Sequence, residues 1–218
     1  MGNVSHAIAR VLYEICINAQ FPLHIWAVSM MYFHAFEEYT SEMDSETEDG
    51  EPTMGFKKEP STTASVDQLM LGVTCMFLSV KANENYLNSA SVPQMTSSRL
   101  SCVLDWAARV VLSYSDKSGH VSSEKLTRVK RRIKEFVPSV ELTIMRIVGN
   151  SLVLDTAFSE SNAEFSESQV AIFVEIYSSP VCLNHSAPDI FAFVNGLDCP
   201  QRAHSAISAA IDRYFIQF

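Results

Sequence analysis

The chain has few glycines and none of the short motifs on which many enzymes depend. Its seven glycines are scattered singly through 218 residues, so no glycine-rich loop is available to cradle the phosphates of a nucleotide. Neither G-x-S-x-G nor H-E-x-x-H occurs, so the sequence signatures of α/β-hydrolases and of zinc metalloproteases are absent. These absences argue against catalysis and against a cofactor, although sequence spacing leaves open a site assembled from distant residues.

Histidine and cysteine lack the spacing of metal ligands and disulfide frameworks. The five cysteines are odd in number and none belongs to a C-x-x-C pair, which predicts free thiols in a reducing, intracellular compartment. The six histidines do not group with cysteine or carboxylates at ligand spacing. His24 and His34 fall on one expected helix about 15 Å apart. We therefore expect no metal site, and we expect these two histidines to be satisfied residues of the core or its rim.

Long hydrophobic runs and positive charge are also scarce. The longest apolar run, Leu23 to Phe36, contains two histidines and is shorter than the roughly 20 residues that cross a bilayer. No basic n-region of a signal peptide opens the chain. The 25 acidic and 16 basic residues give a net charge of −9, which disfavours nucleic acids and anionic membranes as partners. Charged residues make up only 19%, which suggests that a protein partner covers some apolar surface.

Apolar residues at helical spacing are abundant. The run from Leu69 to Val80 is apolar on nearly every side, which predicts a central helix from Ser65 to Lys81, surrounded by other helices. Ser65 and Gln68 have the spacing of a capping box at its start. Ser5 is expected to cap the first helix, and Pro22 to begin the second. The other helices expected from periodicity cover residues 5–19, 22–39, 99–114, 126–147, 168–177 and 202–216.

No stretch shows sustained alternation of apolar and polar residues, so the chain is expected to be all-α. About five helices precede residue 150, and a smaller helical group follows. Pro138 interrupts the longest pattern, which predicts either one kinked helix or two helices that meet there. Gly149 and Asn150 are expected to end it.

Two charged segments stand out from this pattern. Residues 41–63 contain seven acidic residues and two lysines, which predicts a mobile surface insertion. Ser41 and Ser45 have an acidic residue three positions later and are candidates for an acid-directed kinase, although a solvated loop is the favoured interpretation. A basic cluster begins the long helix and is interpreted as a solvated face, with a nuclear-import signal as the alternative: Lys125, Arg128, Lys130, Arg131, Arg132 and Lys134.

Three segments, in the right order, resemble the cyclin box, especially that of transcription-associated cyclins. The resemblance to the first two cyclin helices lies in the segment ARVLYEICINAQFPLHIWAVSMMYFHAFEEY. The third helix and the segment after it are similar to LMLGVTCMFLSVKANENYLNSASV, in which Lys81 and Val92 have the family's spacing. VELTIMRIVGNSLVLD resembles the fifth helix, whose characteristic glutamate is Glu141. The chain departs from the pattern in its 41–63 insertion, in Asn83-Glu84 where two acids are usual, and in the long stretch between Lys81 and Glu141.

The resemblance implies a cyclin-like helical bundle, with one full cyclin box over residues 5–155 and a reduced second repeat over 160–218. It implies a regulatory subunit, not an enzyme, that activates a cyclin-dependent protein kinase by packing on its C-helix, without cofactor, metal or small-molecule ligand. A nuclear location is favoured. In this family the lysine and glutamate of the pattern meet across two helices and bind the kinase. The kinase-binding residues that the resemblance implies are Lys81, Glu141, Glu84, Tyr86, Phe77 and Leu78.

Other interpretations of the same residues remain open. Lys81 suits the negative end of its own helix dipole without any partner, and Glu141 could form a structural ion pair with Arg146 or Arg99. Phe77 is the better candidate for the core, and Tyr86 for an interface. The rival function is a cyclin-fold scaffold or transcription-factor-like adaptor that activates no kinase, although the net charge of −9 counts against binding DNA. A helical enzyme is the third hypothesis.

Overall fold

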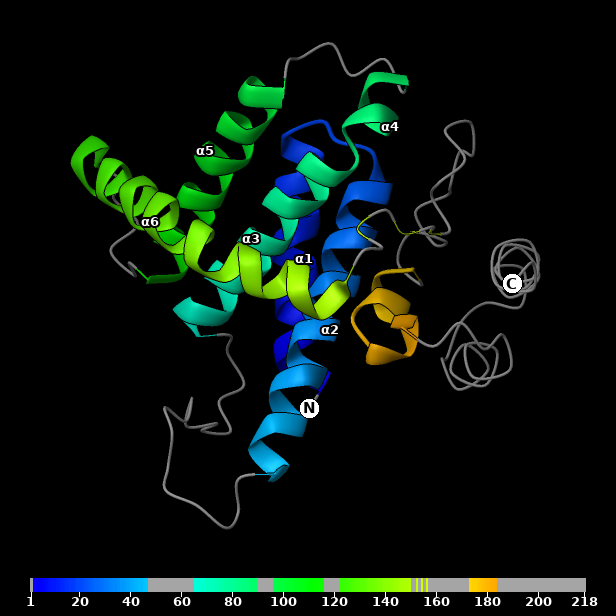
Figure 1. The fold of residues 1–218 in the computed structure, drawn as a ribbon. Helices are drawn as coiled ribbons and strands as arrows, with labels where there is room; N and C mark the ends of the chain where they lie inside the picture. Colours follow the sequence, from blue (N-terminus) through cyan, green and yellow to red (C-terminus); the bar gives the residue numbers. More distant parts are fainter. Residues whose placement is uncertain are drawn as a thin grey trace, which may run out of the picture.

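The structure is a computed structural model that describes residues 2–46, 65–89, 96–115, 122–149, 152, 154, 156 and 173–183. These residues form helices and their connections (Figure 1), and no strand occurs among them, so the all-α expectation is confirmed over these ranges. The elements are α1 (Gly2–Asn18), α2 (Leu23–Glu46), α3 (Val66–Ala82), α4 (Glu84–Ser89), α5 (Thr96–Ser115), α6 (Ser123–Val148), one helical turn at 173–177 and the 3-10 helix η1 (Pro180–Leu183).

Helix α3 lies at the centre of the bundle, as its apolar circumference predicts. Every residue from Leu69 to Val80 is buried, and α1, α2, α5 and α6 all pack against it (Figure 1). Its start is fixed by the predicted capping box: the Ser65 hydroxyl accepts from the Gln68 N–H at 3.2 Å, and the Ser65 N–H donates to Gln68 Oε1 at 2.9 Å. The capping-box prediction is therefore confirmed.

Gly72 lets α1 approach α3 closely. A Cβ atom at this position would lie 2.9 Å from Cγ2 of Ile8 and 3.5 Å from Cδ1 of Leu12. Both are fully buried residues of α1. Glycine is therefore required here by packing, although it lowers intrinsic helix stability.

Several helix boundaries differ from the sequence expectation, among them the start of α1 and the end of α2. Ser5 does not cap α1 but lies inside it, and its hydroxyl donates to the carboxylate of Glu37 on α2 at 3.3 Å. Helix α2 continues beyond Tyr39 to Glu46, because glutamate and methionine in this stretch are good helix formers. The first six residues of the expected acidic insertion are therefore helical, and the rest of it, like Ser45's side chain, lies outside the described residues.

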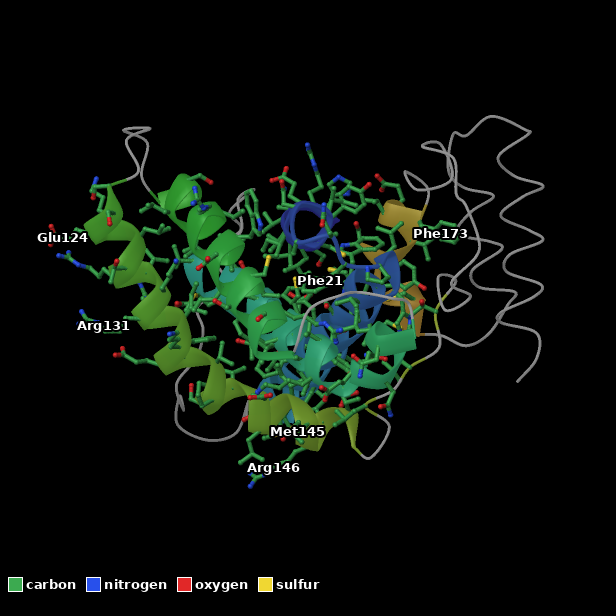
Figure 2. All side chains as sticks on the ribbon, turned by 90° about the horizontal axis from the view of Figure 1, so that it is seen from above. Phe21, Glu124, Arg131, Met145, Arg146 and Phe173 are labelled. Carbon is green, nitrogen blue, oxygen red and sulfur yellow. The ribbon has the colours of Figure 1, made fainter. Side chains whose placement is uncertain are left out.

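Helix α6 passes through Pro138 without ending, so the single kinked helix is the correct alternative. Figure 2 shows the helix changing direction between Arg131 and Met145, as expected where proline removes a backbone hydrogen bond. The predicted end at Gly149 is confirmed: this residue has φ of 73°, and its N–H donates to the Met145 carbonyl at 3.0 Å.

The turn at 173–177 and η1 pack on the outer side of α2 (Figure 1). Phe173, Ile176 and Tyr177 are buried there, and the Tyr177 ring meets Trp26 edge-on at 5.4 Å. His34 Nε2 donates to the Tyr177 carbonyl oxygen at 2.9 Å. The helix expected over 168–177 is confirmed for 173–177, whereas the helix over 202–216 lies outside the described residues, and the division into two repeats stays a prediction.

Replacing Gly72 by valine should destabilise the bundle by about 1–3 kcal/mol, because the added methyl groups overlap Ile8 and Leu12. Gly72→Ala should lose less, since better helix propensity offsets part of the overlap. Urea denaturation of the wild type and both variants measures these differences. Equal stability of all three proteins would show that the α1–α3 approach is not tight.

The stability of the fold should fall as the pH drops below about 6.5, with His34 as one cause. Burial lowers the pKa of His34, so the unfolded chain binds a proton there before the folded chain does, and acid favours unfolding. His34→Gln keeps a donor for the Tyr177 carbonyl but cannot titrate. Urea denaturation at about pH 7 and about pH 5.5 should therefore show a smaller acid-induced loss in His34→Gln than in the wild type; identical losses would exclude this role.

Candidate functional site

Lys81 and Glu141 meet on the surface although 60 residues separate them. Lys81 is the first residue after the buried run of α3, and Glu141 lies three residues after Pro138 in α6. The Lys81 ammonium donates to both oxygens of the Glu141 carboxylate, at 2.7 and 2.8 Å. The structure thus brings together the two residues that the resemblance pairs, and Glu141 has Lys81 rather than Arg99 or Arg146 as its ion-pair partner.

A buried polar network forms around Asn83, the residue that caps α3 two positions after Lys81. The Asn83 backbone N–H and side-chain amide both donate to the Ser79 carbonyl, at 3.0 and 2.9 Å. Asn83 Oδ1 in turn accepts from His24 Nε2 at 3.1 Å, and His24 Nδ1 lies 2.9 Å from the hydroxyl of Thr156. Because Nε2 faces an acceptor, it carries the proton, and Nδ1 accepts from Thr156. This network fixes where Lys81 leaves the core.

The position of Glu141 depends on how α6 packs across α3 and α5. The inner side of α6 is defined by its buried residues, which are Ile133, Val137 and Ile144. Two ion pairs secure the first half of the helix: Arg132 Nη2 lies 3.6 Å from Asp67 of α3, and Lys130 Nζ lies 2.5 Å from Asp105 of α5. With α6 packed in this way, Glu141 lies beside Lys81.

The Lys81–Glu141 pair keeps hydrogen-bonding capacity for a partner. The Lys81 side chain is 42% exposed and the Glu141 side chain 16%. An ammonium has three hydrogens, of which two are directed at Glu141, and each carboxylate oxygen can accept more than one hydrogen bond. The pair therefore offers both a donor and acceptors at one place on the surface.

Two large apolar side chains next to Glu141 are exposed. Leu142 is 52% exposed and Met145 is 38% exposed, and Figure 2 shows Met145 in the part of α6 that follows the change of direction. Neither residue was among those predicted for this site. The signal was available in the helical register, because Leu142 and Met145 fall outside the buried face marked by Val137 and Ile144. Exposed apolar groups beside an accessible ion pair are typical of a protein-binding surface.

The remaining residues that the resemblance assigns to this site lie in different surroundings. Phe77 and Leu78 are 9% and 2% exposed and belong to the core of α3, which leaves little of either side chain for a partner to contact. Glu84 is exposed in the first turn of α4, near the end of α3. Tyr86 lies in α4, but its side chain is outside the described residues.

Other kinds of site find no support in the described ranges. Among those residues, no three histidine, cysteine or acidic side chains come together to hold a metal. No helix that the structure describes is long and apolar enough to cross a membrane. The thiols of Cys16, Cys75 and Cys182 are buried, and burial raises the pKa of Cys16 to about 12, so this thiol stays protonated and a poor nucleophile near neutral pH.

Comparison with known proteins adds no assignment, because no protein-family model, curated protein or solved structure matches the chain.

The Lys81–Glu141 pair should contribute only modestly to stability in the isolated protein. Because the pair is partly exposed, we expect a coupling free energy of about 0.2–1 kcal/mol in a double-mutant cycle of Lys81→Ala and Glu141→Ala, measured by urea denaturation. The exposed Arg128–Glu124 pair of α6 is the control and should couple less. A coupling above about 3 kcal/mol would mark the pair as a buried structural link.

Proposed function

We propose that the chain is a cyclin-like regulatory subunit that binds and activates a cyclin-dependent protein kinase by packing on its C-helix. The observation that carries the proposal is the contact between Lys81 and Glu141 at 2.7 Å. The cyclin-box pattern selects these two residues from the sequence alone, and in cyclins the corresponding residues meet and bind the kinase.

The arrangement of the helices supports the proposal. The resemblance assigns the apolar run that ends at Lys81 to the third helix of a five-helix cyclin box, and α3 packs against α1, α2, α5 and α6. On this assignment α6 is the fifth helix, lengthened at its start by the basic segment. The short helix α4 takes the place of the segment that follows the family's lysine.

The exposed groups around the pair suit a binding surface that works without chemistry of its own. The third hydrogen of Lys81 could donate to a carbonyl oxygen of the kinase backbone just before the C-helix, and the remaining lone pairs of Glu141 could accept from an N–H group there. Leu142 and Met145 supply apolar area for the helix itself. Holding the C-helix inward lets its glutamate pair with the ATP-binding lysine of the kinase. The kinase then performs all the catalysis.

One observation favours a second candidate, a protein-binding scaffold that activates no kinase. Lys81 and Glu141 already satisfy each other, so they would connect α3 to α6 equally well in such an adaptor. A DNA-binding form of the adaptor is disfavoured by the net charge of −9. A nuclear location and a transcription-associated kinase belong to the leading proposal.

Affinity purification from the protein's own cells separates the two candidates. We expect the tagged wild type to recover a protein kinase in stoichiometric amount and in active form, as read by mass spectrometry and a phosphorylation assay. Lys81→Ala/Glu141→Ala should weaken binding by at least about 30-fold, because losing a partly buried polar contact costs about 2–5 kcal/mol of binding free energy.

The matched control is Arg10→Ala/Glu14→Ala, which removes one exposed charge of each sign from α1 and should leave kinase recovery unchanged. Recovery of scaffold or transcription proteins without any kinase would overturn the cyclin proposal and favour the adaptor. Equal loss of kinase in both double variants would remove the Lys81–Glu141 pair from the interface.

A further inference from the structure

Helix α6 carries a continuous exposed stripe beside the Lys81–Glu141 pair. Helical residues three or four positions apart lie on one side, and five exposed residues in this register form what we call the α6 stripe: Arg131, Lys134, Pro138, Leu142 and Met145. Figure 2 shows Arg131 and Met145 on α6, one before and one after the kink. Glu141 borders the stripe between its two halves.

One end of the α6 stripe is cationic. Six of the 16 basic residues of the chain fall within residues 125–134. Three of them are neutralised by acidic neighbours, in the pairs Lys130–Asp105, Arg132–Asp67 and Arg128–Glu124. Arg131 and Lys134 are exposed and have no ion-pair partner within the part of the chain that the structure describes. The internal ion pairs thus leave uncompensated positive charge on the stripe itself.

The other end of the stripe is apolar. Leu142 and Met145 are the exposed large hydrophobic residues of α6, and Pro138 separates them from the cationic end. Lys134 and Leu142 are eight residues apart, which corresponds to about 12 Å along a helix. A segment that lies along the stripe therefore needs anionic groups about 12 Å from its apolar side chains.

We propose that the α6 stripe binds an acidic segment of the partner kinase, with carboxylates on Arg131 and Lys134 and adjoining apolar side chains on Leu142 and Met145. This inference rests on the proposed function and adds the chemistry of the partner to it. Charge complementarity selects the occupant: the net charge of −9 repels an acidic segment from most of the chain, whereas the cationic end attracts it. Attraction confined to one end would fix the direction in which the segment docks.

The test compares binding of the kinase recovered with the wild type to two stripe variants and one control. Arg131→Glu/Lys134→Glu reverses the charge of the cationic end, and Arg131→Gln/Lys134→Gln removes it with little change in side-chain shape. Arg10→Glu/Arg109→Glu makes the same charge reversal at exposed positions of α1 and α5. Circular dichroism checks that all the proteins fold, and surface plasmon resonance measures association and dissociation rates.

We expect charge reversal on the stripe to weaken binding by about tenfold or more, mainly through slower association, and the glutamine variant to lose less. The difference from the wild type should shrink as salt rises from about 0.05 to about 0.5 M, because salt screens exposed charges. The α1 and α5 control should lose much less than the stripe variant.

The outcomes separate this inference from the function on which it rests. Equal affinity of the wild type and the stripe variants overturns the inference and leaves the kinase proposal standing. Failure of the wild type to recover any kinase overturns both. A binding difference that disappears after nuclease treatment assigns the cationic end to nucleic acid, and a variant-dependent mass of the isolated chain in light scattering assigns the stripe to a second copy. Either result contradicts an acidic kinase segment.

Discussion

Burial of α3 on every side is the constraint on which the rest of the structure depends. A helix that is apolar from Leu69 to Val80 must be covered by neighbours all round, and α1, α2, α5 and α6 provide that cover. Charged residues of α3 reach the surface only at its two ends, Asp67 in the first turn and Lys81 in the last. The neighbour that crosses beside Lys81 is α6, so the position of Glu141 follows from the same packing. The candidate site is thus a consequence of how the core is closed.

Much of this arrangement could be predicted because its signals are local. The capping box of Ser65 and Gln68, the glycine at the end of α6 and the apolar circumference of α3 depend on residues close in sequence. The choice of Lys81 and Glu141 came from the family pattern, not from periodicity. Helix limits were predicted less well: Ser5 has the chemistry of a cap, but packing of α1 against α2 gives its hydroxyl a partner in Glu37.

The apolar half of the site was not predicted: helical register separates Leu142 and Met145 from the buried residues of α6, but their exposure at this site also depends on tertiary geometry. Leu142 and Met145 are exposed only because α6 buries a different side of itself against α3 and α5. The kink at Pro138 then determines which residues of its second half lie near Lys81. Likewise, the pairing of Lys130 with Asp105 and of Arg132 with Asp67 decides which basic residues stay uncompensated, and both pairs join residues that are distant in sequence.

Hydrogen–deuterium exchange of the chain alone and in complex with the proposed partner kinase tests the central claim most directly. If the Lys81–Glu141 surface binds the kinase, protection should increase at the end of α3, in α4 and in the second half of α6, with little change in α1. Protection confined to α1 or to the 173–183 segment, with α3 and α6 unchanged, would contradict the account, because the kinase would then bind away from the pair that cyclins use.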